Sequence, residues 1–311
     1  RDQIKRAPYP RGFHCSPTLQ NWAREMIGHL RQCDVYGHLV TNHYATDYTW
    51  IDGQLAREQT EEGRPLLDYV VGDVYRSVEK RYVQAALDNQ VWFNTNLKAE
   101  TRKPFWITEY GGNFDAAPPA FLHSDVHCGL WATWMTEGAG TPLFWWYDFI
   151  EVNNLYPYYG AFSKYVKGED RRGINGTSLR MPVSGDDRVV GYCYKWPAGA
   201  YGWVYCDAVM RSMPAESERP VFEGISSSIS ELNAGKYRVE YWNCYTGNID
   251  HAETVDVTAG KTVKLKFPKF TNNMAVKVKL EGAPVTPAAA SVPPPQSAPA
   301  VPPPVAPAVK K

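Results

Sequence analysis

Carboxylate, imidazole, amide and phenol side chains gather at the ends of four short apolar segments of this sequence. They are Asn42 and His43, Asp73 and Tyr75, Glu109, and Asp148. Side chains of these types can transfer protons, act as nucleophiles or hold a polar substrate. Because they are spread over about a hundred residues, they can act together only if the fold brings the four segment ends to one place.

The elements that carry these residues alternate between strand and helix patterns. Apolar runs predict strands over 38–44, 66–75, 104–112 and 142–148. Helical spacing of apolar residues predicts helices after Ser16-Pro17, over 78–89 and over 126–134. Strand–helix alternation at this spacing is typical of a parallel sheet, and nearly continuous apolar strands indicate that both faces are covered. A closed parallel barrel and a doubly wound sheet both place ligands at the carboxyl ends of their strands, so this pattern does not choose between them.

The rest of the chain has a different texture. Residues 175–281 show polar–apolar alternation with Gly and Asn turns, which predicts an antiparallel β-sandwich. Within it, Cys193 and Cys206 either face each other across a hairpin or are buried free thiols. Residues 283–311 are almost entirely Pro, Ala, Val and Ser, a composition that predicts a disordered or polyproline-like spacer.

Composition excludes several classes of function. The chain has 33 Lys+Arg and 33 Asp+Glu, so its formal net charge of zero predicts neither nucleic-acid binding nor attraction to an anionic membrane. No apolar run reaches the ~18 residues of a membrane helix. The six Cys residues lack zinc-ligand spacing, and no carboxylate follows His123 and His127 in a zinc-protease pattern. We therefore expect no metal and no cofactor.

The segment from Trp106 through Glu109 to Gly112 resembles the seventh, nucleophile-bearing strand of retaining glycoside hydrolases of the large (β/α)8-barrel clan. The cellulase and β-mannanase type (family five) and its relatives are the nearest group. Other segments resemble further parts of these enzymes: the fourth helix and fifth strand (21–44), the sixth strand (68–75), the eighth strand (142–148) and the following β-sandwich (234–247). The sequence departs from the family at Asp73, where the family often has His.

The resemblance implies an α/β fold made of the C-terminal part of a (β/α)8 TIM barrel (1–172), an antiparallel β-sandwich (175–281) and a disordered Pro/Ala-rich tail (283–311). It also implies an acid/base in an Asn-Glu pair at the end of the fourth strand. The sequence contains no Asn-Glu pair. Four parallel strands cannot close a barrel and would leave two open edges. We therefore expect a fragment whose acid/base lies upstream of Arg1 and which cleaves poorly alone.

The resemblance implies roles for particular residues. Glu109 would be the nucleophile and Tyr75 would orient it. Four residues would contact substrate: Trp145, Trp146, His43 and Asp148. Trp145 and Trp146 are consecutive, so they should face opposite sides of their strand, one towards the core and one towards the site.

The implied function is cleavage of β-linked glycosidic bonds in a polysaccharide or oligosaccharide outside the cell or in the periplasm. A non-catalytic carbohydrate-binding or cell-surface protein with a degenerate barrel is the alternative. An unrelated α/β enzyme, in which Glu109 does not face an aromatic cleft, is a third possibility. The sugar, its linkage and the choice between endo and exo attack stay open.

Overall fold

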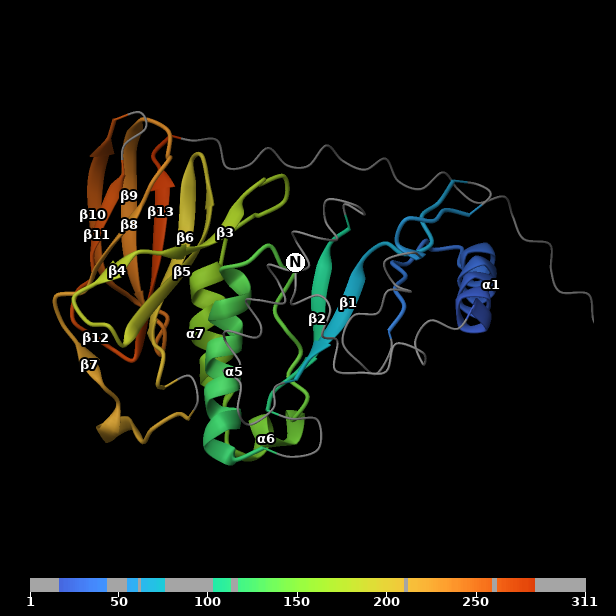
Figure 1. Ribbon diagram of the computed structural model, residues 1–311, viewed down its shortest axis with the longest axis horizontal. Helices are drawn as coiled ribbons and strands as arrows, with labels where there is room; N and C mark the ends of the chain where they lie inside the picture. The colour runs from blue at the N-terminus through green and yellow to red at the C-terminus, as the bar shows by residue number, and fades with distance from the viewer. Residues whose placement is uncertain are drawn as a thin grey trace, which may run out of the picture.

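The computed structural model describes residues 17–43, 55–60, 63–75, 103–112, 117–209, 212–258 and 262–282. The chain forms a mixed α/β fold with several sheets and few helices (Figure 1). The expected helix over 78–89 and the Pro/Ala-rich tail lie outside the described residues.

Two parallel strands form the centre of the N-terminal region. β1 (Val70–Val74) pairs with β2 (Phe105–Tyr110) in the parallel direction, as the strand–helix alternation predicts. An extended segment lies beside each strand. The Asp68 amide donates to the Val40 carbonyl at 2.8 Å on one side, and the Leu143 amide donates to the Ile107 carbonyl at 3.1 Å on the other. The four segments therefore lie side by side in the predicted order.

Helices cover part of this sheet. α1 (Pro17–Cys33) starts at the predicted proline, α5 (Pro119–Trp134) matches the predicted helix over 126–134, and α7 (Tyr156–Val166) packs against α5. α5 and α7 lie between β1/β2 and the β-rich region that follows (Figure 1). α5 is buried on nearly all sides, so its apolar residues are not confined to one stripe, and polar side chains such as Asp125 are buried among them.

The expected end of the fourth strand is wrong. The extended segment stops at Trp146, and Tyr147 begins the short helix α6 (Tyr147–Val152). Asp148 therefore lies in the first turn of a helix, where the positive end of the helix dipole stabilises its carboxylate. The apolar run 142–147 could not show this change because an apolar run fits a strand and a short helix equally well.

The region after residue 176 is built from antiparallel strands, as predicted. A six-stranded sheet has the order β10-β9-β13-β6-β5-β3, a three-stranded sheet has the order β11-β8-β4, and β12 pairs with β7. The strands are β3 (Thr177–Met181), β4 (Val183–Ser184), β5 (Val189–Trp196), β6 (Gly199–Cys206), β7 (Val221–Phe222), β8 (Ser226–Ile229), β9 (Gly235–Asn243), β10 (Ile249–Val257), β11 (Val263–Lys266), β12 (Phe270–Thr271) and β13 (Asn273–Leu280). A buried core joins residues of the six- and three-stranded sheets, among them Val204, Val276 and Leu265.

The β5–β6 hairpin does not place its two cysteines opposite each other. The register pairs Cys193 with Gly202, and Cys206 with Val189. Both residues are buried free thiols, and burial raises the pKa of Cys193 to about 12. The alternative in which they face each other is therefore wrong, because the turn closes at residues 197–198 and shifts the midpoint of the hairpin.

The junction between α7 and the β-rich region contains a buried ionic cluster. Lys277 and Lys279 donate hydrogen bonds to the Glu169 carboxylate, and the Tyr201 hydroxyl donates to it at 2.7 Å. Burial alone would raise the pKa of Glu169, but the two lysines hold it below its ordinary value. The Lys277 ammonium also lies 4.6 Å from the centre of the Tyr165 ring on α7. Helix and sheet therefore share one packed interior.

None of the described helices is long and apolar enough to cross a membrane.

Candidate functional site

A one-residue bulge in β2 sets the direction of Glu109. The register pairs Gly72 with Ile107 and then Asp73 with Glu109, so Thr108 is the extra residue. An extra residue breaks the alternation of side chains between the two faces of a strand. Thr108 and Glu109 are both only half-buried, whereas Ile107 is fully buried. Without the bulge, Glu109 would share the face of Ile107 and point into the packed interior.

Glu109 is held by the phenol of Tyr75. The Tyr75 hydroxyl donates a hydrogen bond of 2.7 Å to Oε2 of Glu109. Burial, with the nearby Glu109 carboxylate adding to it, raises the pKa of Tyr75 well above its ordinary value. The phenol therefore keeps its proton and remains a hydrogen-bond donor to the carboxylate.

A second pair lies beside the first. Nε2 of His43 lies 2.8 Å from Oδ1 of Asp73, and the Thr108 hydroxyl donates to the same oxygen at 3.4 Å. The Asp73 side chain is almost fully buried. Burial, with the nearby charge of Glu109 adding to it, raises the pKa of Asp73 to about 6, against the opposing hydrogen bonds to His43 and from Thr108. Asp73 therefore keeps its proton to higher pH than an exposed carboxyl group does.

Three of these side chains could also hold a cation. His43, Asp73 and Glu109 each offer one ligand atom, and these atoms lie within 4.8 Å of one another. One imidazole and two carboxylates are a donor set that divalent metals accept. In the structure, Asp73 accepts a hydrogen bond from Thr108 and Glu109 accepts one from Tyr75.

A glycine turn after β2 fixes the position of this strand end. Gly111 has φ +116°, and a Cβ there would lie 2.4 Å from Cε2 of Phe144. The Gly112 amide, at φ +58°, donates to the buried carboxylate of Asp125 at 2.7 Å. The Trp146 indole donates to the Gly111 carbonyl at 2.9 Å. Only glycine tolerates both this backbone and the close approach of the ring.

The two consecutive tryptophans differ in burial. Trp146 is partly buried, packs against the core and binds the glycine turn. Trp145 is 45% exposed, and its amide donates to the Tyr110 carbonyl at 2.9 Å. Of the two, Trp145 is therefore the side chain that a ligand can reach freely.

The structure gathers three of the six predicted site residues into one hydrogen-bonded and electrostatic cluster: His43, Tyr75 and Glu109. Trp145 and Trp146 adjoin it through the end of β2, whereas Asp148 is exposed on α6. Sequence reasoning placed Asp73 at a strand end but gave it no role in the site, and it missed Asp125. The sequence does carry a signal for Asp73, which is a carboxylate inside an apolar run. Such a residue is expected to be buried, and a buried charge needs hydrogen-bond partners.

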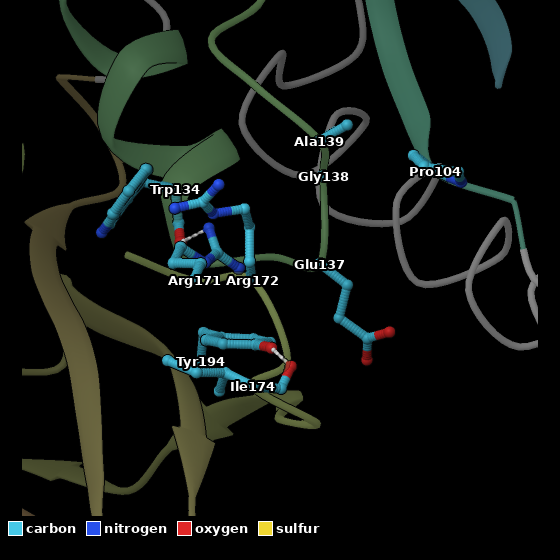
Figure 2. A pocket seen from close by; sticks show the side chains of 9 residues that line it. All are labelled: Pro104, Trp134, Glu137, Gly138, Ala139, Arg171, Arg172, Ile174 and Tyr194. Carbon is cyan, nitrogen blue, oxygen red and sulfur yellow. Dashed lines mark hydrogen bonds between the residues drawn. The ribbon is translucent and has the colours of Figure 1, made fainter. Parts of the chain in front are cut away.

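A cavity of about 450 Å³ lies away from this cluster, at the start of β2. It is lined among others by Pro104, Glu137 and Tyr194 (Figure 2). The Arg171 guanidinium lies over two of its aromatic rings, 4.7 Å from the centre of Trp134 and 4.1 Å from that of Tyr194. These ring faces are therefore occupied by a cation, and the cavity adds nothing to the Glu109 site.

No family model and no curated protein sequence matches this chain. Among solved structures, it is similar to an endoxylanase of glycoside hydrolase family 30 from Clostridium papyrosolvens, with 12% identity, a TM-score of 0.44, and coverage of 84% of this chain and 60% of that one. A family 5 glycoside hydrolase from Bacteroides vulgatus is 16% identical with a TM-score of 0.48, and the match covers 84% of this chain and 59% of that one. A family 44 xyloglucanase from Paenibacillus polymyxa is 12% identical with a TM-score of 0.43, and the match covers 84% of this chain and 60% of that one. The chain thus spans about three-fifths of the length of each.

Proposed function

We propose that this protein is a glycoside hydrolase that cleaves β-linked glycosidic bonds with retention of configuration, using Glu109 as the nucleophile. The observation that carries the proposal is the hydrogen bond from Tyr75 to Glu109 at the carboxyl ends of two parallel strands. This arrangement keeps one carboxylate oriented and half-exposed, which a carboxylate nucleophile requires.

The geometry assigns a task to each oxygen of Glu109. Oε2 accepts the Tyr75 hydrogen bond, which leaves Oε1 to attack the anomeric carbon. As the new C–O bond forms, the bond to the leaving oxygen breaks, and an acid must protonate that oxygen. Water then hydrolyses the glycosyl ester and regenerates the carboxylate. The neutral phenol keeps Oε2 in place through both steps.

Retention requires a second carboxyl group ~5–5.5 Å from the first. Asp73 is near Glu109, but its buried oxygen is already bonded to His43 and Thr108. It is therefore poorly placed to reach a leaving group. We assign the acid/base to a segment outside this sequence, which completes a (β/α)8 barrel in front of the β-sandwich.

Exposed apolar surface supports this assignment. On the sheet side, Leu39 is 74% and Leu143 46% exposed; on α1, Trp22, Met26 and Leu30 lie one turn apart and are each about half exposed. Solvent-exposed apolar surface of this extent marks a region that another segment covers. The remaining strands and helices of a barrel would cover both. The expected location is outside the cell or in the periplasm, where polysaccharides are found.

A carbohydrate-binding protein that does not cleave is the second candidate. The burial of Asp73 favours it, because this carboxyl group near Glu109 does not face solvent. The two candidates differ only in whether an acid completes the site.

The test is hydrolysis of β-glucans, mannans, xylans and aryl β-glycosides by the protein expressed from its complete coding sequence. Glu109→Ala should lower kcat by about 10³-fold or more, with added azide restoring turnover of activated aryl glycosides. Glu137→Gln, in the cavity at the other end of β2, is the matched control and should retain activity. Sugar binding without hydrolysis, or an active Glu109→Ala protein, would refute the nucleophile assignment.

A further inference from the structure

Three aromatic side chains near the Glu109 strand end are exposed to solvent. Trp145 is 45%, Tyr147 71% and Tyr156 54% exposed. They come from the end of the fourth extended segment, the first residue of α6 and the first residue of α7. Contiguous exposed apolar surface on a folded protein is uncommon and marks a binding surface.

Hydrogen bonds through the backbone and through Glu151 link the three aromatic residues. The Tyr147 amide donates to the Trp145 carbonyl at 3.0 Å. Tyr147 and Glu151 lie one turn apart on the same face of α6. The Tyr156 hydroxyl donates to Oε2 of Glu151 at 2.6 Å, which fixes the second tyrosine beside that face. Glu151 thus joins the two tyrosines across the α6–α7 connection.

This row begins at the catalytic strand and leads away from it. The Trp145 amide is bonded to the carbonyl of Tyr110, the residue after Glu109. α6 lies beyond the ends of β1 and β2, at the end of the sheet that carries Glu109 (Figure 1). A ligand that passes Glu109 can therefore continue over Trp145 towards α6.

The chemistry of the row suits a neutral sugar chain. Flat aromatic rings offer apolar faces and polar edges, which match the C–H faces and hydroxyl rims of pyranose rings. The exposed carboxylates of Asp148 and Glu151 accept hydroxyl hydrogen bonds and repel anionic polymers. The exposed stripe on α1 differs, because its Met26 and Leu30 are aliphatic and typical of a surface that packs against protein.

We propose that Trp145, Tyr147 and Tyr156 form a platform that binds the sugar units of a neutral β-linked polysaccharide beyond the bond that is cleaved. The proposal rests on the proposed function for its substrate class. It adds that the substrate is a long chain, attacked within its length, since a platform beyond the scissile bond is used only when sugar units extend over it.

Retardation in native gels that contain a soluble polysaccharide tests the platform without requiring turnover. The probes are hydroxyethyl cellulose, arabinoxylan and galactomannan, with polygalacturonate as the anionic comparison. The protein should be retarded by at least one neutral polymer and not by polygalacturonate. Tyr147→Ala and Tyr156→Ala should each weaken that affinity about 3- to 10-fold, the effect of losing one stacked ring.

Tyr36→Ala is the matched control, because Tyr36 is 80% exposed in the turn after α1. Tyr147→Phe keeps the ring and should retain affinity. The proposal is overturned if no neutral polymer retards the protein, or if the Tyr147→Ala protein binds as well as the Tyr36→Ala protein. The Glu109→Ala protein should still be retarded by the same neutral polymer, whether or not it has lost hydrolysis. The gel result therefore tests the platform separately from the hydrolase proposal.

Discussion

Replacing Asp73 with Asn should change how the stability of the protein depends on pH. Asp73 is buried, and its pKa is raised from 3.8 to about 6 in the folded protein. Between these two values the folded protein holds a proton that the unfolded chain has lost. The contribution of Asp73 to stability must therefore fall as pH rises through this window, because at this group the folded state binds more protons.

The shift fixes the size of the effect. A rise of about two pKa units corresponds to about 3 kcal/mol at ~1.4 kcal/mol per unit. The contribution of protonated Asp73 is fully present below pH 3.8 and is lost by about pH 6. Asn has no such proton. The free energy of unfolding of Asp73→Asn minus that of the parent should therefore increase by about 3 kcal/mol between pH 3.5 and 7.

Urea unfolding followed by tryptophan fluorescence at half-unit pH steps measures this difference. Thr108→Val serves as an internal check, because it removes a hydrogen bond that lowers the pKa of Asp73. In that variant the decline in stability should extend to higher pH. A difference curve that stays flat, or that falls as pH rises, would show that Asp73 is ionised throughout and that burial does not control it.

Three further changes probe the site and its support. Tyr75→Phe should lower kcat about 10- to 100-fold with little effect on KM, measured by steady-state kinetics, because a charged hydrogen bond is lost. Gly111→Ala should destabilise the protein by more than ~2 kcal/mol in urea unfolding, whereas Gly28→Ala in α1, with open space around it, should stabilise it by about 0.5–1 kcal/mol. Glu169→Gln should cost about 3–5 kcal/mol because it leaves a buried lysine charge uncompensated. The exposed pair of Glu223 should contribute no more than ~1 kcal/mol, and equal losses in Glu169→Gln and Glu223→Gln would refute this reasoning.

The order of the elements could be predicted from the sequence because it depends on local patterns. Each element carries its own local signal. Examples are the proline at the start of α1, the apolar run of β2 and the polar–apolar alternation along β9. The Tyr75–Glu109 contact was predictable from the resemblance of two strand ends to a known family. Each element, and each of the two strand ends, can be read from about ten consecutive residues.

The rest depends on pairing between distant segments. The bulge at Thr108 is visible only in the register of β2 against β1, and no residue in the strand marks it. His43 and Asp73 are 30 residues apart, so their bond exists only once the segments lie side by side. Sequence spacing could not show which of Trp145 and Trp146 binds the glycine turn.

The shared interior of α7 and the β-rich region limits how this protein can be recombined. Residues 175–281 transplanted into another enzyme would carry the buried Lys277 away from Glu169, its charge partner. They would also uncover Tyr201 and Trp203, which pack in the same core cluster as the helix residues Trp131 and Tyr165. The β-rich region is therefore not a portable cassette, and a functional chimera must inherit α5 and α7 together with it.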